Sequence, residues 1–347
     1  MFNSVFYNSI EVYDSYSEIA PIIVNKGFIT SLIVVASLIV SILLIRKSTY
    51  NKLTWGISMR SWEWTLSIFL IVTSFFSAFV ELAYHVEAYI PVEASGDMFI
   101  SGLIMFFMLA LLFWVRNKKP AFAKISVLFV SIAALIGYFT YFHFSEIQVR
   151  NSYLDPDYLN NFYYYIEEGT EIKTKLSHFL VHYISSLSVI GMAVLMYSIV
   201  KKLVGKKSVL TKISLWTSVA IGLFVLTSET DHLVVLLSYT TDANLYDIAE
   251  QSRKIAWPVL WGISSFVLMV LGMKLKLSHL RIMSLSLFFV TLLKLFLYDI
   301  QDIHPAGKIA AFISLGILLL IVSFMYQKIK WVVQDEAKDK ADSEINQ

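Results

Sequence analysis

Long stretches without a charged side chain constrain the fold of this chain more than any other feature. Residues 27–45 and 98–115, for example, contain no Asp, Glu, Lys or Arg. A helix needs about 20 residues to cross a hydrocarbon core of roughly 30 Å. Because 57% of the residues are hydrophobic and only 16% are charged, against about 25% charged in soluble domains, a water-soluble globule could not bury the apolar surface. We therefore expect an all-α fold, a polytopic bundle of transmembrane helices.

The apolar stretches predict about nine transmembrane helices. Their ranges are 27–45, 63–84, 98–115, 125–143, 177–200, 213–237, 255–273, 282–299 and 308–326. Residues 1–25 carry acidic groups and no Lys or Arg, so they lack the basic region of a signal peptide, and we expect the first span to be retained. The expected organisation is an external segment 1–26, a transmembrane domain 27–330 and a disordered cytoplasmic tail 331–347 of mixed charge.

Basic residues gather in alternate connections between these spans. One set of connections and the C-terminal tail hold Arg46, Lys47, Lys52, Arg60, Arg116, Lys118, Lys119, Lys124, Lys201, Lys202, Lys206, Lys207, Lys212, Lys274, Lys276, Arg281, Lys328, Lys330, Lys338 and Lys340. The other set and the N-terminus hold only Lys26, Arg150, Lys173, Lys175, Arg253, Lys254 and Lys308. Since short loops rich in Lys and Arg face the cytoplasm, the pattern places the N-terminus outside and the C-terminus inside. An odd number of crossings agrees with this orientation.

The longest external connection, about 144–176, is rich in aromatic and acidic residues. Its members include Tyr153, Asp155, Asp157, Tyr158, Phe162, Tyr163, Tyr164, Tyr165, Glu167 and Glu168. Aromatic side chains are enriched at the headgroup level of membranes. We expect this connection to lie on the membrane surface, either as an interfacial helix or as a stacking surface for a sugar or lipid headgroup.

Several classes of function find no support in the sequence. Without cysteine there is no disulfide framework and no Cys-ligated metal or iron–sulfur site. No phosphate-binding Gly-rich loop, G-x-S-x-G string or H-E-x-x-H string is present, so no nucleotide cofactor is implied. The formal net charge of +2 gives no reason to expect nucleic acid as a partner. The expected partner is the lipid bilayer.

Six of the seven histidines map to expected external helix ends or to the loops beside them, and acidic residues accompany them. The candidate outer-leaflet polar pocket comprises Glu81, His85, His178, His182, Glu229, Asp231 and His232. Ionisable groups at membrane depth are costly and usually functional. Three interpretations stay open, namely scattered interfacial residues, a shared pocket for a substrate or proton, and a transition-metal site. His178 and His182, four residues apart, are the candidate metal ligands.

Lys294 lies in the middle of an apolar span, where a charged side chain needs a partner. Asp299 follows five residues later and is the candidate for an intramembrane ion pair. We expect this pair to orient the helix. A role for Lys294 in coupling to an ion or a proton is the alternative.

Three strings near the C-terminal end suggest a family. They read WPVLWGISSFVLMVLG, LRIMSLSLFFVTLLKLFLYDI and FISLGILLLIVSFMY. They resemble the closing helices of the bacterial multi-pass proteins catalogued as domain of unknown function 2339, at Trp261, Gly272, Arg281, Lys294, Asp299, Phe312, Gly316 and Tyr326. Lys308 stands where that family usually has Arg, which keeps the positive charge and loses a bidentate contact.

This resemblance carries implications for location and length. It implies a bacterial inner (cytoplasmic) membrane protein, and it brings no established activity. The earlier strings NKGFITSLIVV and FFSAFVELAYHVEAY are similar to family segments more loosely. Since members of the family are typically longer, the resemblance leads us to expect either a short form or a fragment.

Three functions are compatible with these observations. The first is an envelope component that binds or processes a glycan or lipid at the outer-leaflet polar pocket. The second is a proton-coupled secondary transporter, and the third is a non-catalytic scaffold subunit with envelope protein partners. The one-sided placement of histidines and acids favours the first. The sequence names neither a substrate nor an oligomeric state, and it leaves enzymatic activity open.

Overall fold

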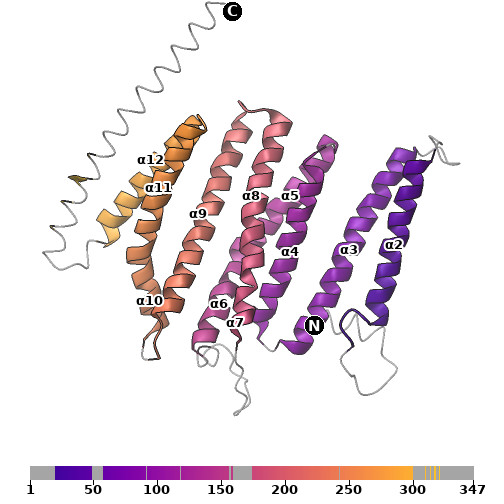
Figure 1. Cartoon of the computed structure of the whole chain (residues 1–347), viewed down its shortest axis with the longest axis horizontal. Coiled ribbons are helices and arrows are strands. Elements are labelled where there is room, and N and C mark those ends of the chain that lie inside the picture. The colour runs from indigo at the N-terminus through magenta and orange to yellow at the C-terminus, as the bar shows by residue number, and fades with distance from the viewer. Residues whose placement is uncertain are drawn as a thin grey trace, which may run out of the picture. The chain divides into compact units, whose positions relative to one another are not determined.

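The computed structural model describes most of the transmembrane region (Figure 1). The described residues are 20–48, 58–90, 92–117, 119–155, 158, 174–241 and 243–299, with 309, 313, 316, 317 and 320. They divide between two compact units, Met1–Ile221 and Gly222–Gln347. Each unit is described by itself, and helix α9 (Val209–Ser238) contributes residues to both.

Eight helices in the described part of the chain are long and apolar enough to cross a membrane. They are Lys26–Lys47, Met59–Tyr89, Glu93–Val115, Ala121–Leu154, Leu176–Val204, Val209–Ser238, Leu245–Lys274 and Ser278–Tyr298. This confirms the all-α, multi-pass fold. The ninth predicted span, 308–326, lies outside the described residues except at five helical positions, Ile309, Ile313, Gly316, Ile317 and Leu320. The predicted tail 331–347 also lies outside them.

Helix α4 (Glu93–Val115) is the centre of the first unit. It packs against α3 (Met59–Tyr89), α5 (Ala121–Gly137), α6 (His143–Leu154) and α8 (His182–Val204) (Figure 1). Its buried small residues are Ala94, Ser95, Gly96, Ser101 and Gly102. Small side chains let helix backbones approach closely, and such packing stabilises helix association in lipid.

Helix α2 (Lys26–Lys47) shows the opposite pattern, because it packs mainly on α3 and leaves most of its surface exposed. Of the residues in its most apolar 18-residue stretch, only 6% are buried, against 39% in the corresponding stretch of α4. The hydroxyls of Ser37 and Ser41 donate to backbone carbonyls four residues earlier, at 2.8 Å each. These bonds satisfy polar groups that lipid cannot hydrate. The surface of α2 is therefore suited to contact acyl chains.

A π-helical turn, η1 (Tyr138–Phe142), joins α5 to α6. The helix therefore continues to Leu154, beyond the predicted end at residue 143. Single π turns inside α-helices occur frequently at functional sites. Here the turn precedes a segment that buries five polar side chains, those of Ser145, Glu146, Arg150, Asn151 and Ser152. Of the predicted external connection 144–176, residues 156–157 and 159–173 lie outside the described part.

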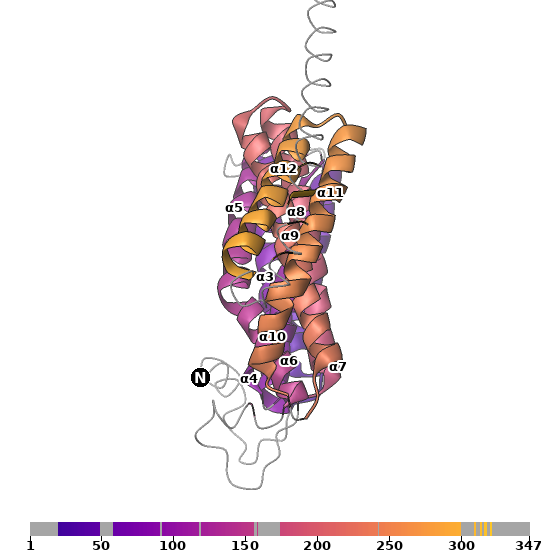
Figure 2. The same cartoon turned by 90° about the vertical axis from the view of Figure 1, so that its left-hand side faces the viewer.

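The second unit contains a pair of packed helices, α11 and α12, which Figure 2 shows side by side. Its elements after α9 are α10 (Leu245–Gln251), η3 (Ser252–Ala256), α11 (Trp257–Lys274), α12 (Ser278–Lys294) and η4 (Leu295–Asp299). Gly272 allows the close approach, because a Cβ there would lie 2.9 Å from the backbone nitrogen of Arg281. The Ser284 hydroxyl donates to the Ser265 carbonyl at 2.7 Å.

Candidate functional site

Glu81 binds the segment that leads into α2. Its Oε1 accepts a hydrogen bond from the backbone N–H of Ile23 at 2.8 Å, and its two carboxylate oxygens accept from Asn25 Nδ2 at 2.9 and 2.8 Å. Asn25 also caps α2, since its Oδ1 accepts from the N–H of Phe28 at 2.8 Å. Glu81 is only 6% exposed. Its carboxylate thus joins the start of α2 to α3.

The backbone of Ile23 shows that this attachment holds a strained conformation. Its φ is 65°, in the left-handed region that β-branched residues rarely adopt. Such conformations cost about 1–3 kcal/mol and persist where surrounding contacts impose them. Contacts of this kind among the described residues include the Glu81 bond to Ile23 and a bond from the N–H of Ala20 to the hydroxyl of Tyr84 at 3.1 Å.

His85 completes this cluster one turn along α3. Its Nε2 lies 3.0 Å from Glu81 Oε1, and the residue is 8% exposed. Its ring lies edge-on to Tyr84 and stacks on Tyr89, with centroids 5.1 and 5.9 Å apart. Its Nδ1 is buried without a hydrogen-bond partner among the described residues. The carboxylate, imidazole and amide of Glu81, His85 and Asn25 therefore form one buried cluster, named here the α2 clamp.

His178 and His182 lie on either side of the junction between α7 (Leu176–Leu180) and α8. His182 is fully buried, and its Nδ1 bonds to the carbonyl of Phe179. Its ring centroid lies 4.3 Å from that of Phe179 and 4.2 Å from that of Tyr183. The ring of His178 instead packs edge-on against Phe99 of α4 at 6.0 Å. Both imidazole rings thus pack against aromatic side chains.

A second buried cluster lies around the η1 turn and was not predicted. The hydroxyl of Tyr138 donates to Glu146 Oε1 at 3.0 Å, and Nδ1 of His143 lies 3.1 Å from Glu146 Oε2. Ser186 of α8 lies 3.4 Å from the same Tyr138 hydroxyl. Glu146 is 1% exposed and Tyr138 is 2% exposed. We call Tyr138, His143, Glu146 and Ser186 the polar network.

Further hydrogen bonds join the helices that flank the polar network. The hydroxyl of Ser145 donates to Asp97 Oδ2 of α4 at 2.8 Å. The hydroxyl of Ser101 donates to that of Ser185 at 2.9 Å, which joins α4 to α8. Because each bond crosses between helices, polar contacts as well as small residues stabilise this part of the first unit.

Arg150 lies one turn after Glu146 on the same helix and is 2% exposed. Its Nε and Nη2 donate to the side-chain oxygen of Asn151 at 3.0 and 2.9 Å. Nearby, the hydroxyls of Ser152 and Thr174 lie 2.8 Å apart. Burial of an arginine in a membrane bundle is costly unless its donors are bonded, so this end of α6 is a polar interior rather than a lipid-facing surface.

The remaining candidates belong to the second unit. Glu229, Asp231 and His232 lie on the part of α9 that follows Ile221, and His232 is 1% exposed with its Nε2 3.2 Å from the hydroxyl of Ser228. Glu229 and Asp231 are half-buried. The site that these three residues were predicted to share with the first unit stays a prediction.

Lys294 has a backbone hydrogen-bond partner that was not predicted from the sequence. Its Nζ donates to the carbonyl oxygen of Arg253 at 2.8 Å, within the π-helical turn η3. It also lies directly before the π-helical turn η4. The side chain of Asp299 lies outside the described residues, so the ion pair with Lys294 stays a prediction.

The described residues contain no group of three or more His, Asp or Glu side chains arranged to hold a metal ion. Sequence reasoning missed the polar network because the apolar criterion ended the helix at residue 143. A signal was present, however, since His143, Glu146 and Arg150 follow one another at three and four residues. This spacing places all three on one helical face.

These features define a polytopic helical membrane protein with buried ionisable clusters. The family described as "Predicted membrane protein (DUF2339)" matches residues 6–329. The chain therefore belongs to this family, and the match extends well beyond the C-terminal strings that carried the resemblance. The comparisons with curated proteins and with solved structures found no match.

Proposed function

We propose that the protein lies in the bacterial inner membrane and binds the polar headgroup of an envelope lipid or glycan at the polar network of the first unit. The observation that carries this proposal is the contact between the buried carboxylate of Glu146 and the partly exposed imidazole of His143. The Glu146 side chain is 1% exposed, whereas the side chain of its partner His143 is 19% exposed. A buried carboxylate in a membrane bundle is costly and usually functional. Because His143 connects Glu146 to the surface, a bound ligand could interact with this pair.

The chemistry of the residues fits a hydroxyl-rich ligand. Carboxylate oxygens accept hydrogen bonds from hydroxyl groups, and an imidazole either donates or accepts. Tyr141 and Phe144, on either side of His143, are 51% and 56% exposed. Aromatic rings at this position provide apolar faces against which a sugar ring or glycerol backbone packs.

This proposal keeps part of the predicted outer-leaflet pocket and changes the role of another part. His182 stays with the site, because it lies one turn before Ser186 on α8. Glu81 and His85 take a structural role in the α2 clamp. Glu229, Asp231 and His232 are held as residues of a second polar site in the second unit.

The test compares ligand retention between isosteric variants. Protein extracted gently from native membranes would be assayed by mass spectrometry for co-purified lipids and glycolipids. We expect Glu146→Gln and Tyr138→Phe each to lower the retained headgroup-bearing species about tenfold, the effect of one charge-assisted hydrogen bond. Thr140→Val is the matched control, because Thr140 is exposed on the same π turn and donates to the carbonyl of Ile136. Equal retention by all variants would reject the site.

The proposed orientation has its own test. The chain contains no cysteine, so single cysteines report accessibility without background. We expect a membrane-impermeant maleimide to label Tyr153→Cys, which follows the polar network, in spheroplasts with intact inner membranes. Lys206→Cys, in a predicted cytoplasmic loop, should react only after permeabilisation. The reverse pattern would place the polar network on the cytoplasmic side.

A second candidate function, proton-coupled transport, is favoured by one observation in the second unit. Lys294 donates to a backbone carbonyl inside a π-helical turn, and irregular backbone at membrane depth is tolerated where it is buried or lines a cavity. Proteoliposomes of the wild type and of Lys294→Met would be compared for pH-gradient dissipation across a panel of solutes. Flux that Lys294→Met abolishes would support transport, and no flux in either would reject it.

A further inference from the structure

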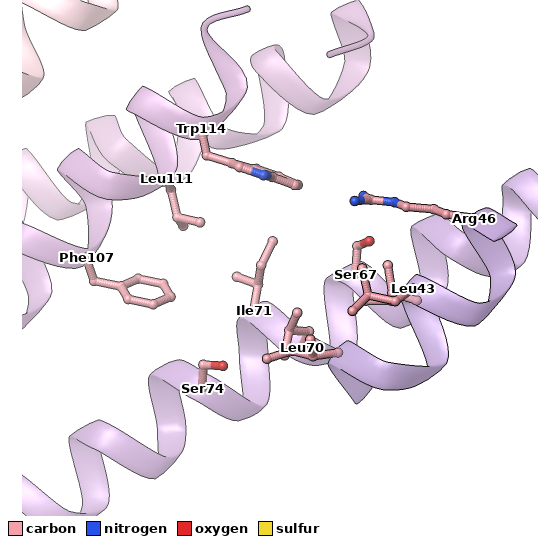
Figure 3. A pocket seen from close by; sticks show the side chains of 11 residues that line it. Leu43, Arg46, Ser67, Leu70, Ile71, Ser74, Phe107, Leu111 and Trp114 are labelled. Atoms are coloured by element: carbon pink, nitrogen blue, oxygen red, sulfur yellow. The ribbon is translucent and has the colours of Figure 1, made fainter. Parts of the chain in front are cut away.

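An apolar groove opens between α2, α3 and α4, away from the polar network. It is a cavity of about 350 Å³, within the range of about 300–1,000 Å³ typical of small-molecule sites. Figure 3 shows Phe107 and Leu111 of α4 across the groove from Ile71 of α3 and Leu43 of α2. Its lining along α3 runs from Ser67 to Ser74, about 10 Å at the helical rise. The groove is therefore long enough to hold a segment of an acyl chain.

One end of this groove carries positive charge. Arg46 and Trp114 both line it, and Figure 3 shows their side chains extended toward one another across its end. Lys119 lies beside them, with its Nζ 4.0 Å from the ring centroid of Trp114 and 5.3 Å from that of Trp64. Tryptophan at this level is typical of the membrane interface.

The charges at this end do not cancel among the described residues. Arg46 Nε donates to Glu63 Oε1 at 2.7 Å, and their side chains are 50% and 30% exposed. Partial burial and the positive charge of Arg46 lower the pKa of Lys119, although Glu63 opposes that shift. Two cations therefore face one carboxylate, and a further negative charge beside Lys119 and Arg46 would be favourable.

We propose that this groove binds one anionic phospholipid, with its phosphate between Arg46 and Lys119 and an acyl chain along Leu43, Ile71 and Leu111. An amphiphile is the ligand that matches an apolar groove with a cationic and aromatic end. Arginine binds phosphate through paired N–H groups, and among the described residues Arg46 bonds Glu63 through its Nε alone. Ile39 and Leu43 of α2 line the groove and are 43% and 50% exposed, so the groove is open along α2, where an acyl chain could enter.

The headgroup half of this proposal is tested by charge removal. Protein in nanodiscs containing equal amounts of phosphatidylglycerol and phosphatidylcholine would be transferred to the gas phase, and the lipids that stay bound would be counted by native mass spectrometry. We expect the wild type to retain phosphatidylglycerol preferentially. Each of Arg46→Gln and Lys119→Gln should lower that preference about fivefold, as expected for one basic residue at an anionic surface.

The matched control is Lys206→Gln, which removes an exposed positive charge that is not part of the groove. It should leave the preference for phosphatidylglycerol unchanged. An equal loss in Lys206→Gln would mean that the bound lipid follows net charge, and the proposal would be wrong. Wild-type preference in both groove variants would also overturn it.

The acyl-chain half is tested by filling the groove. Ser74→Leu replaces the hydroxyl by three carbon atoms at the end away from Arg46, whereas Val72→Leu enlarges an exposed side chain on the same helix and off the groove. We expect Ser74→Leu to lower total lipid occupancy at least threefold and Val72→Leu to leave it unchanged. A melting temperature equal to that of the wild type would show that both variants fold. Full occupancy in Ser74→Leu would exclude an acyl chain from the groove.

Discussion

Removal of the Glu81 carboxylate should loosen α2 from α3. Among the described residues, three groups bond this carboxylate, namely the N–H of Ile23, the amide of Asn25 and the ring of His85, at 2.8–3.0 Å. At about 1 kcal/mol for each buried group left without its acceptor, Glu81→Ala should cost about 3 kcal/mol. In a unit of this size, each kcal/mol of lost stability lowers the melting temperature by about 2–4 °C, so the midpoint of thermal unfolding should fall by about 6–12 °C.

The isosteric variant separates hydrogen bonding from charge. Glu81→Gln keeps the oxygen that accepts from Ile23, and it replaces Oε2, which faces Asn25, by a donor. We expect a loss of about 1 kcal/mol, or about 2–4 °C. Thermal unfolding in detergent, followed by intrinsic fluorescence, measures both variants, with Glu87→Ala as the control at an exposed position of α3.

Two results would refute this reasoning about the α2 clamp. A Glu81→Ala midpoint within 2 °C of the wild type, an interval below the roughly 6–12 °C calculated from the lost bonds, would show that the clamp contributes little stability. A Glu81→Gln midpoint as low as that of Glu81→Ala would show that charge, rather than hydrogen-bond geometry, holds the segment. The second result would return Glu81 to the set of groups with a proton-linked role.

Two further predictions concern close packing and titration. Gly272→Ala should destabilise the second unit by about 1–3 kcal/mol, because its Cβ would lie 2.9 Å from the backbone nitrogen of Arg281. The control is Gly262→Ala, which has open space around its Cβ and should not destabilise the unit. Equal midpoints of the two variants in thermal unfolding would contradict this prediction. Arg46→Gln should slow acylation of Lys119 at pH 9, because loss of the Arg46 charge raises the pKa of Lys119 and lowers its neutral, nucleophilic fraction. Peptide-resolved mass spectrometry measures the rate of acylation. A rate equal to or faster than that of the wild type would show that Arg46 does not lower the pKa of Lys119.

Sequence reasoning predicted the helices because their signal is local. A transmembrane helix needs a long apolar stretch, and residues 27–45 or 98–115 supply it without reference to any other part of the chain. The helix that ends at Leu154 was shortened by the same criterion, since its last turns bury Glu146 and Arg150 rather than apolar side chains. Burial of polar residues inside a bundle removes the hydropathy signal on which the prediction rests.

The candidate sites were predicted less well because they depend on contacts between distant residues. Glu81 and His85 were found from their spacing of four residues on one helix. The partner of Glu81, Asn25, is 56 residues away in sequence, and no local pattern indicates that pairing. The same holds for Ser186, which approaches Tyr138 across 48 residues.

The central claim is that a ligand headgroup reaches the polar network of the first unit. A side-chain-resolution cryo-EM map of the protein in nanodiscs formed directly from native membranes tests it most directly. We predict non-protein density within hydrogen-bond distance of His143 or Glu146, flanked by Tyr141. A map in which protein side chains alone satisfy this network, and in which acyl chains cover His143, would contradict the proposed function.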